Sequence, residues 1–461
     1  MENQTPKKKS PLKTLVLGAA LVLAALLVVA VVMTMSAPQD PQVATPTGSA
    51  ILPTEATTAP TTQPPTEPPI VKESTFTLSA TGDILIHAPV FNAAAVSGGY
   101  NFDPMFTFIR DYIGAADLAV GNLETTLAGN DNGYKYNGYP RFNCPDEIVD
   151  GVKNAGFDLL LTANNHAYDT SSTGLHRTVE VVREKGLLNL GSKADANEPN
   201  YLIVEQNGIS LALACYTYET NQDPAKKSPN GLPMKTGDIP LMNTFDYANL
   251  NLLYKEVEQS MALSAEEGAD AFILFIHWGT EYQTKQNAQQ SQIAQKLCDL
   301  GVDVIIGGHP HVIQPVELLT STTDSQHKTV CLYSMGNAVS NQRIKSMNLK
   351  TGHTEDGVVF SVTFARYSDG TVVLESADLL PTWVNLDKHP ETGKTAYMIL
   401  PLDDQVEDWK TTLQLSDSTL KKAQDSYART TKIVGAGMTQ VNEYLSQHQA
   451  EVEAAIGVEA N

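Results

Sequence analysis

Short apolar runs alternate with longer amphipathic segments from about residue 74 onward. The apolar runs have the length and the branched or aromatic content of buried strands, and the longer segments have the length of helices. Strands are predicted at residues 75–81, 118–121, 158–162, 271–276 and 302–307. Helices are predicted at residues 145–156, 172–185, 245–267 and 286–301. This alternation predicts an α/β fold built on a largely parallel sheet that is covered on both faces.

The pattern changes near the C-terminus, where apolar runs follow one another without helices between them. The later, antiparallel strands are expected at residues 330–333, 357–366 and 371–380. The last two are expected to be joined by the turn Ser368-Asp369-Gly370. Polar helical stretches are expected at residues 418–428 and 439–455. We therefore predict an α/β domain with an antiparallel component at 74–400, followed by a helical C-terminal extension at 401–461.

Residues 15–35 form an apolar run with no charged side chain. As a helix, these 21 residues would be about 31 Å long, enough to cross a bilayer core. The lysines at residues 1–14 predict a cytoplasmic N-terminus, so we expect a single-pass cell-membrane protein whose main domain is extracellular. A cleaved signal peptide is the alternative. Residues 37–72 are rich in proline and threonine and are expected to form an extended, disordered linker.

The charge of the chain excludes one class of partner. The 461 residues include 31 lysines and arginines against 52 aspartates and glutamates, for a net charge of −21. A nucleic-acid-binding domain would normally present a basic face, so no nucleic-acid partner is expected. The four cysteines form no C-x-x-C pair, which argues against a zinc ribbon or a redox pair. Buried free thiols are the favoured interpretation, and a disulfide stays open.

Polar residues gather where the predicted strands end, which is where open α/β sheets bind ligands. Five strand ends carry carboxylate, amide or imidazole groups: Asp83 and His87; Asn122 and Glu124; Asn164, Asn165, His166 and Asp169; His277 and Glu281; His309 and His311. Each residue alone could be a turn former, a cap or a core residue, but five such ends together favour one site. This donor set suits one or two Mn²⁺, Zn²⁺ or Fe ions.

Six motifs in order extend this interpretation. They are TGDILIH, VGNLETTL, LLLTANNHAYDTSSTGL, FILFIHWGTEY, GVDVIIGGHPHVIQPVE and LYSMGNAVSNQ, within residues 76–342. The set resembles the calcineurin-like metallophosphoesterase superfamily and, within it, the CapA family of poly-γ-glutamate capsule biosynthesis proteins. The resemblance implies a metallophosphoesterase-like α/β/β/α sandwich with mixed sheets, preceded by one N-terminal transmembrane helix. It also implies divalent metal cofactors.

The resemblance implies roles for individual residues. The expected metal ligands are Asp83, Glu124, Asn165, His277, His309 and His311. The expected catalytic residues are His166, which would stabilise developing charge, and Asp169, which would orient it. The expected substrate contacts at the rim of the site are Asn122, Glu281 and Asn337. Two positions depart from the family pattern: Leu85 replaces a histidine, for which His87 is a candidate substitute, and Glu124 replaces a bridging aspartate. One ion and two ions both stay open.

Three functions are compatible with these features. The favoured one is a membrane-anchored extracellular CapA-like protein of poly-γ-glutamate capsule biosynthesis with a metal-dependent, hydrolase-type site. The alternatives are a stand-alone metallophosphoesterase that acts on an extracellular phosphoester, and a non-catalytic partner of a membrane polymer synthase. The expected partners are the bilayer, through residues 15–35, an anionic polymer and membrane synthase subunits.

Overall fold

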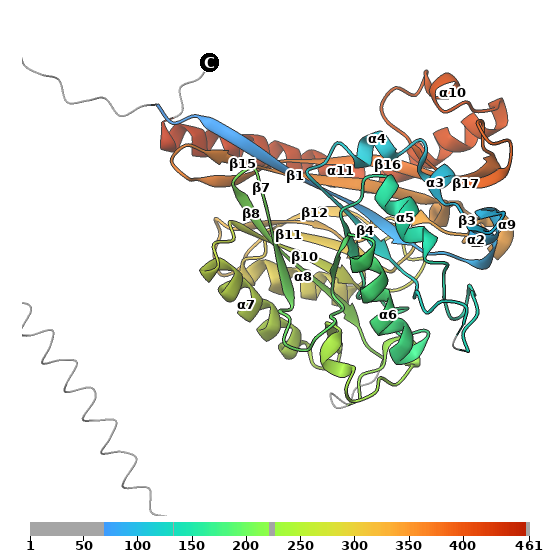
Figure 1. Cartoon of the computed structure of the whole chain (residues 1–461). Helices are drawn as coiled ribbons and strands as arrows, with labels where there is room; N and C mark the ends of the chain where they lie inside the picture. The colour runs from blue at the N-terminus through green and yellow to red at the C-terminus, as the bar shows by residue number, and fades with distance from the viewer. Residues whose placement is uncertain (1–68, 132, 221–225, 458–461) are drawn as a thin grey trace, which may run out of the picture. The chain divides into compact units, whose positions relative to one another are not determined.

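The computed structural model describes residues 69–131, 133–220 and 226–457 (Figure 1). The predicted transmembrane segment at 15–35 lies outside the described residues, as does the predicted linker apart from its last four residues. In the part of the chain that is described, no helix combines the length and the apolar character needed to cross a membrane.

Two mixed sheets form the centre of the described domain. The first contains, in spatial order, β17 (Thr395–Pro401), β16 (Val372–Lys388), β15 (Asp356–Tyr367), β1 (Lys72–Ile84), β4 (Leu118–Leu123), β5 (Leu159–Leu161) and β6 (Leu188–Leu190), with β14 (Asn337–Val339) paired to β1. Strands β1, β4, β5 and β6 are parallel. Strands β15, β16 and β17 continue this sheet in antiparallel pairing.

The second sheet has a parallel centre with antiparallel edges. Its order is β12 (Val316–Thr320), β13 (Lys328–Leu332), β11 (Val304–Gly308), β10 (Ala271–His277), β8 (Ile209–Tyr218) and β7 (Tyr201–Gln206), with β9 (Thr244–Phe245) paired to β8. Strands β8, β10, β11 and β13 are parallel, and β7 and β12 are antiparallel to their neighbours. A short hairpin, β2 (Ala95–Val96) with β3 (Gly99–Tyr100), stands apart from both sheets.

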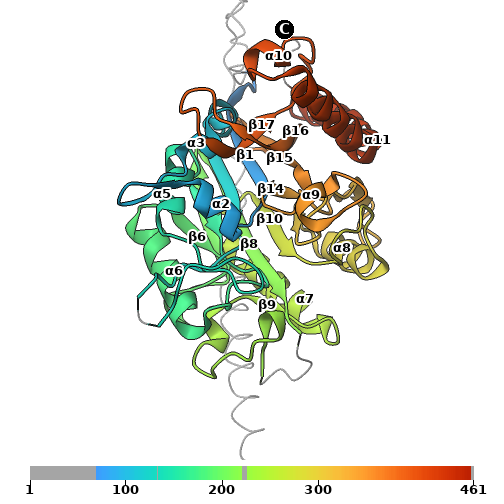
Figure 2. The ribbon, with the colours of Figure 1, turned by 90° about the vertical axis from the view of Figure 1, so that its right-hand side faces the viewer.

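Helices cover the outer face of each sheet, and apolar side chains from both sheets fill the space between them. The first sheet is covered by α2 (Ala88–Ala93), α3 (Asp103–Phe106), α4 (Arg110–Ile113), α5 (Glu147–Asn154) and α6 (Ser171–Glu184). The second is covered by α7 (Leu250–Glu266) and α8 (Ala288–Leu300). Figure 2 shows α5 and α6 on one side of the strands and α7 and α8 on the other. The shared inner core includes Phe76 and Val120 from the first sheet and Leu213 and Phe275 from the second.

The C-terminal residues add α9 (Ile344–Met347), α10 (Trp409–Thr412) and the long helix α11 (Asp417–Ile456). Val434 of α11 is buried in the shared inner core, so this helix closes one side of the sandwich. The side chain of Arg429 donates from Nε and Nη2 to the two oxygens of Asp356, at 2.7 and 2.6 Å, and Ser426 donates to the same carboxylate at 2.6 Å. Because Asp356 is buried, these bonds compensate a charge that would otherwise destabilise the domain.

The prediction of a mixed α/β fold is confirmed, but the expectation of a largely parallel sheet needs correction. The parallel strands divide between two sheets, and each sheet also has antiparallel strands. Strand β13, expected to be antiparallel, is parallel to β11 and antiparallel only to β12. The pairing of β15 with β16 through the predicted turn is confirmed. Apolar runs report which residues are buried, and they do not report which strands become neighbours.

Two further expectations can be compared with the structure. The two helical stretches at 418–428 and 439–455 form one continuous helix, α11. The four cysteines are buried free thiols, as predicted.

Candidate metal centre

The carboxyl ends of strands from both sheets meet at one site. Strand β1 brings Asp83, and its register places Asp83 beside Asn122 of β4 and Asn337 of β14. Strand β10 ends at His277, opposite Gly308 of β11. Parallel strands present their carboxyl ends at the same edge, so packing two such sheets face to face brings two groups of strand ends together.

Two clusters of possible ligands share one carboxylate. Ligand atoms of Glu124, His277 and His309 lie within 4.8 Å of one another, and so do those of Asp83, Glu124 and His311. Every member of both clusters is buried. The clusters thus contain five of the six predicted ligands, with Glu124 between them.

The sixth predicted ligand, Asn165, joins the first cluster. Its Oδ1 lies 2.9 Å from Nε2 of His277. Two atoms that bind one ion at about 2.0–2.1 Å are about 3 Å apart when their bonds are roughly perpendicular, so this spacing fits a shared ion. All six predicted ligand residues are therefore brought together by the fold.

Two buried groups in this site lack hydrogen-bond partners. Both carboxylate oxygens of Glu124 are inaccessible and accept no hydrogen bond, and Nδ1 of His309 is likewise without a hydrogen bond. Nε2 of His277 and Nε2 of His311 lie 3.5 and 3.9 Å from Oε1 of Glu124, so these imidazoles compensate the carboxylate only through space. A cation between the clusters would compensate the buried carboxylate directly. The residues present therefore fit one or two divalent cations, with carboxylate, amide and imidazole donors.

The two histidines of the turn after β11 have opposite pKa shifts. Burial alone would lower the pKa of His311, but the charge of Glu124 and the hydrogen bond to Asp83 raise it to about 9. The Nδ1 atom of His311 lies 3.0 Å from Oδ2 of Asp83. Burial and the neighbouring histidines hold the pKa of His309 well below its ordinary value. His309 is therefore a neutral imidazole, the form that binds metals.

The turn after β11 has an unusual backbone. His309 and His311 have φ angles of 96° and 56°, in the left-handed region that non-glycine residues rarely adopt. A Cβ atom on Gly307 would lie 2.0 Å from the carbonyl oxygen of Tyr333, so only glycine allows this close approach. Such conformations cost about 1–3 kcal/mol each and cluster at functional sites. The GGHPH sequence thus aims two imidazoles into one site from a single turn.

The predicted catalytic pair is in direct contact. Nδ1 of His166 donates to Oδ2 of Asp169 at 2.7 Å, and the same oxygen accepts the backbone N–H of Phe142 at 2.7 Å. Burial lowers the pKa of His166, but the hydrogen bond to Asp169 and the charges of Asp169 and Glu124 together raise it above its ordinary value. This pairing fixes the imidazole ring and leaves its Nε2 atom available on the side of the cavity.

Of the three predicted rim residues, one lines the cavity and two are buried beside the ligands. Glu281 is exposed and lines the cavity beside the clusters. Asn122 and Asn337 are not at the rim, because both side chains are buried. Asn122 donates to Oδ1 of Asp83 at 2.7 Å, and Oδ1 of Asn337 lies 3.1 Å from Nδ1 of His311. They orient ligands from neighbouring strands instead of facing a substrate.

His87 does not replace the missing histidine of the first motif. Its Nδ1 atom accepts the backbone N–H of Asn341 at 3.2 Å, and its ring packs edge-on against Phe142. Burial lowers the pKa of His87 to about 4, so it is neutral. It lies in the wall of the cavity and belongs to neither ligand cluster.

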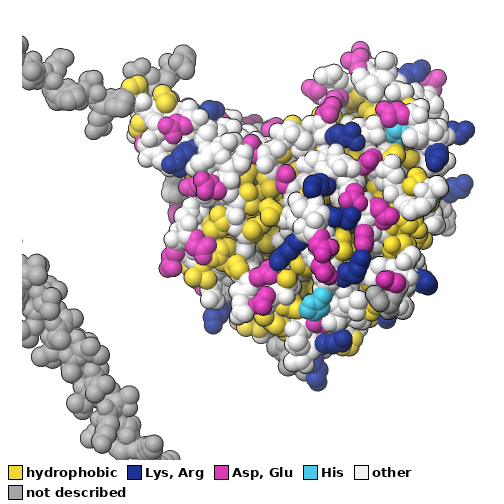
Figure 3. Space-filling model, viewed as in Figure 1, with side chains coloured by type: hydrophobic (Ala, Val, Ile, Leu, Met, Phe, Trp, Pro, Cys, Tyr) yellow, Lys and Arg dark blue, Asp and Glu magenta, His cyan; other side chains and the backbone are white. Residues whose placement is uncertain are grey.

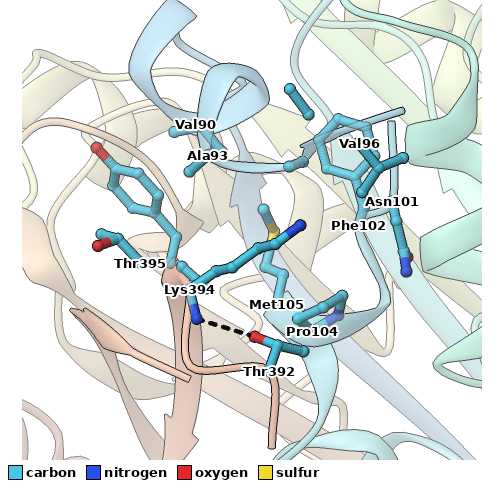
Figure 4. Close-up of a pocket in the computed structure, with 14 residues that line it drawn as sticks. Val90, Ala93, Val96, Asn101, Phe102, Pro104, Met105, Thr392, Lys394 and Thr395 are labelled. Carbon is cyan, nitrogen blue, oxygen red and sulfur yellow. Dashed lines mark hydrogen bonds between the residues drawn. The ribbon is translucent and has the colours of Figure 1, made fainter. Parts of the chain in front are cut away.

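Two cavities lie near this end of the domain, and they differ in chemistry. The first, which we call the metal-centre cavity, has a volume of about 640 Å³ and is lined by Asn165, His166 and His311 among others. The second, of about 220 Å³, is mainly apolar and is shown in Figure 4 with Val90, Phe102 and Lys394. Among its described lining residues there is no histidine, aspartate or glutamate, so the metal chemistry belongs to the first.

Sequence reasoning missed much of the lining of the metal-centre cavity. Tyr139, Phe142 and Asn230 lie in loops outside the six recognised motifs. Gln342 and Tyr282 are the last residues of two recognised motifs, LYSMGNAVSNQ and FILFIHWGTEY, and that position was the available signal for both.

The mixed α/β fold brings two acid–histidine clusters together at its strand ends, and their donor atoms could hold divalent cations. A sequence profile of the family described as bacterial capsule synthesis protein PGA_cap matches residues 77–342. The chain belongs to this family, and the predicted relation to CapA proteins is confirmed.

Individual relatives agree with this assignment. The chain is 28% identical over 289 residues to the capsule biosynthesis protein CapA of Bacillus anthracis, covering 61% of this chain. It is 27% identical over 274 residues to the PGA biosynthesis protein CapA of Bacillus subtilis strain 168, covering 59% of this chain. The matched region spans 64% of each relative's length. A crystal structure described as a candidate 5′-nucleotidase of Staphylococcus aureus is 14% identical, with a TM-score of 0.39 over 67% of this chain and 54% of that one.

Proposed function

We propose that this chain is a metal-dependent hydrolase of the calcineurin-like metallophosphoesterase class that serves capsule polymer biosynthesis. The observation that supports this most is Glu124, a buried carboxylate that accepts no hydrogen bond and is shared by two sets of imidazole and oxygen donors. Family membership supports the capsule role, because the relatives are described as capsule and PGA biosynthesis proteins.

The proposed reaction is hydrolysis of a phosphoester. Divalent ions held by the two clusters would polarise a phosphoryl oxygen and make water a better nucleophile. The P–O bond to the leaving group breaks, the oxygen of water joins phosphorus, and the leaving oxygen takes up a proton. His166 is placed to supply that proton from Nε2, since Asp169 holds its other ring nitrogen. Asn122 and Asn337 keep Asp83 and His311 in position.

Replacing His309 by alanine is expected to lower the metal content and to abolish hydrolysis. His309 contributes an unpartnered buried nitrogen to the first cluster, and no other histidine of that turn can reach the same place. The measurement is elemental mass spectrometry of the purified full chain, reloaded with Mn²⁺ or Zn²⁺, beside hydrolysis of p-nitrophenyl phosphate. His448→Ala is the matched control, because His448 stacks on Tyr444 in α11 and lies outside both clusters.

The outcomes separate the candidate functions. The proposal is supported if the wild type binds about two ions, His309→Ala binds fewer, and only the wild type hydrolyses the phosphoester. Bound ions without hydrolysis of any phosphoester favour a non-catalytic partner of a polymer synthase. Full metal content in His309→Ala contradicts the assignment of the site.

We further propose that residues 15–35 anchor the chain in the cell membrane with the N-terminus in the cytoplasm and the domain outside. The support is the uncharged run, the lysines before it and the Pro/Thr-rich segment after it. A protease added to intact cells that lack an outer membrane is expected to release a fragment that begins within residues 37–72. Complete protection of the chain, with cleavage only after lysis, would instead indicate a domain in the cytoplasm.

A further inference from the structure

The metal-centre cavity has little positive charge of its own. Among the described residues, no lysine or arginine lines it, and its one charged side chain apart from the histidines is Glu281. Lysines and arginines are present elsewhere on the surface, interspersed with acidic residues (Figure 3). Recognition of several phosphates or carboxylates usually relies on arginine or lysine. The cavity is thus suited to a ligand with one anionic group, at the clusters, and an uncharged remainder.

Aromatic rings stand at the mouth of this cavity. Tyr139 is 78% exposed and Tyr282 is 41% exposed, although rings of this size gain stability from burial. Deeper in the cavity, the ring of Phe142 packs edge-on against His166, with centroids 4.6 Å apart. Exposed rings beside a polar site offer flat faces on which the apolar face of a ligand can stack.

The backbone of Tyr282 has a conformation that residues other than glycine rarely adopt. Its φ angle is 64°, and its N–H donates to the carbonyl of Pro310 at 2.8 Å, in the turn between the two ligand histidines. Its hydroxyl accepts from Nε2 of Gln342 at 3.3 Å. Its ring centroid lies 6.3 Å from that of His311. A non-glycine residue in this conformation is strained, and such strain is typical of residues placed for function.

The loop that carries Tyr139 is also fixed. The buried side chain of Asn143 accepts from the N–H of Ala128 and donates to the carbonyls of Gly129 and Lys135. One residue earlier, the backbone of Phe142 is bonded to Asp169. Tyr139 is therefore presented from a preorganised loop, which lowers the entropy lost when a ligand binds.

Amide side chains supply the remaining polar groups of the cavity. Asn230, Asn341 and Gln342 line it. Oδ1 of Asn341 accepts from the hydroxyl of Tyr397 at 2.6 Å, and Gln342 is bonded to Asn337 and Tyr282, so these two amides are held in place. An amide group has two N–H donors and two acceptor lone pairs, which leaves further capacity for a ligand. Sugar hydroxyls also donate and accept, so amides and a carboxylate such as Glu281 can bond them in pairs. Carboxylate-rich ligands would instead face Glu281 with like charge.

We propose that the metal-centre cavity binds a sugar residue, stacked on Tyr139 and Tyr282 and bonded by the amides and Glu281. The identity of the substrate rests on the proposed hydrolase function. If that function holds, the substrate is a glycosyl phosphoester whose single phosphate lies at the clusters. Hydrolysis breaks the P–O bond to the sugar, the oxygen of water joins phosphorus, and the sugar oxygen takes up a proton, which His166 is placed to supply.

Binding can be tested apart from catalysis by saturation-transfer NMR on the full chain, with and without Zn²⁺. The ligands are maltose, lactose, chitobiose, glucose 1-phosphate and a short poly-γ-glutamate oligomer. At least one sugar is expected to receive saturation on its ring protons. The signal should fall several-fold in Tyr139→Ala and Tyr282→Ala and persist in Tyr282→Phe. Tyr112→Ala is the matched control, since Tyr112 is an exposed tyrosine that bonds Asp403 and does not line the cavity.

The two proposals can fail separately. Tyrosine-dependent sugar binding without hydrolysis of glucose 1-phosphate or p-nitrophenyl phosphate supports the sugar site and rejects the hydrolase. Tyrosine-dependent binding of the poly-γ-glutamate oligomer with no sugar signal overturns the sugar site. Absence of a tyrosine-dependent signal for every sugar overturns it as well.

Discussion

Replacing Glu124 by glutamine is expected to abolish binding of both metal ions. Glu124 belongs to both ligand clusters, is fully buried and accepts no hydrogen bond at either oxygen. Glutamine keeps the shape of the side chain but removes the charge that would neutralise a cation on either side. A variant of a residue in one cluster, such as His309, should reduce binding less completely than the shared residue does.

The stability of this variant gives a second, independent signal. Metal-free Glu124→Gln loses both the cost of a buried carboxylate and its attraction to the imidazolium of His311, so its stability should stay close to that of the metal-free wild type. Added Zn²⁺ or Mn²⁺ should raise the Tm of the wild type, since a ligand at 100 times its Kd stabilises by about 2.7 kcal/mol. The variant should show no such rise. Glu281→Gln, which changes an exposed carboxylate in the same cavity, should keep it. An equal metal-induced rise in Glu124→Gln would refute the shared-ligand assignment.

Replacing Gly437 by alanine is expected to destabilise the domain by about 1–3 kcal/mol through overpacking. A Cβ atom at this position would lie 1.9 Å from the carbonyl oxygen of Val316 in β12. That oxygen belongs to a strand backbone and cannot turn away as a flexible side chain could. Helix α11 would have to move off the sheet edge, which would disturb the core contacts of Val434 and Val441.

The neighbouring glycine of the same helix provides the matched control. A Cβ atom on Gly435 would meet nothing within 4 Å. Gly435→Ala should therefore stabilise the domain by up to about 1 kcal/mol, through helix propensity alone. Thermal denaturation of both variants, with hydrogen exchange of α11, measures the difference. A Tm for Gly437→Ala as high as that for Gly435→Ala would show that α11 does not pack this closely on β12.

The ligand residues could be found from the sequence because each follows a recognisable strand. Asp83, Glu124 and His277 end apolar runs, and strand ends are where α/β proteins bind ligands. The division of these ligands between the two clusters could not be predicted in the same way. Glu124 occupies both clusters and His87 neither, because these positions depend on distances across two sheets.

The sequence by itself determined the residue types that gather at the site, the alternation of strands and helices, and the family. These properties are local: a residue type, a periodicity of burial and a motif order are all present in the linear chain. The resemblance implied two mixed sheets, but only the tertiary structure decided which strands pair within each, that Asn122 and Asn337 are buried behind the ligands, and that Tyr139 and Tyr282 stand at the mouth of the cavity. Those properties depend on which distant segments pack together, and packing is set by shape complementarity across the whole core.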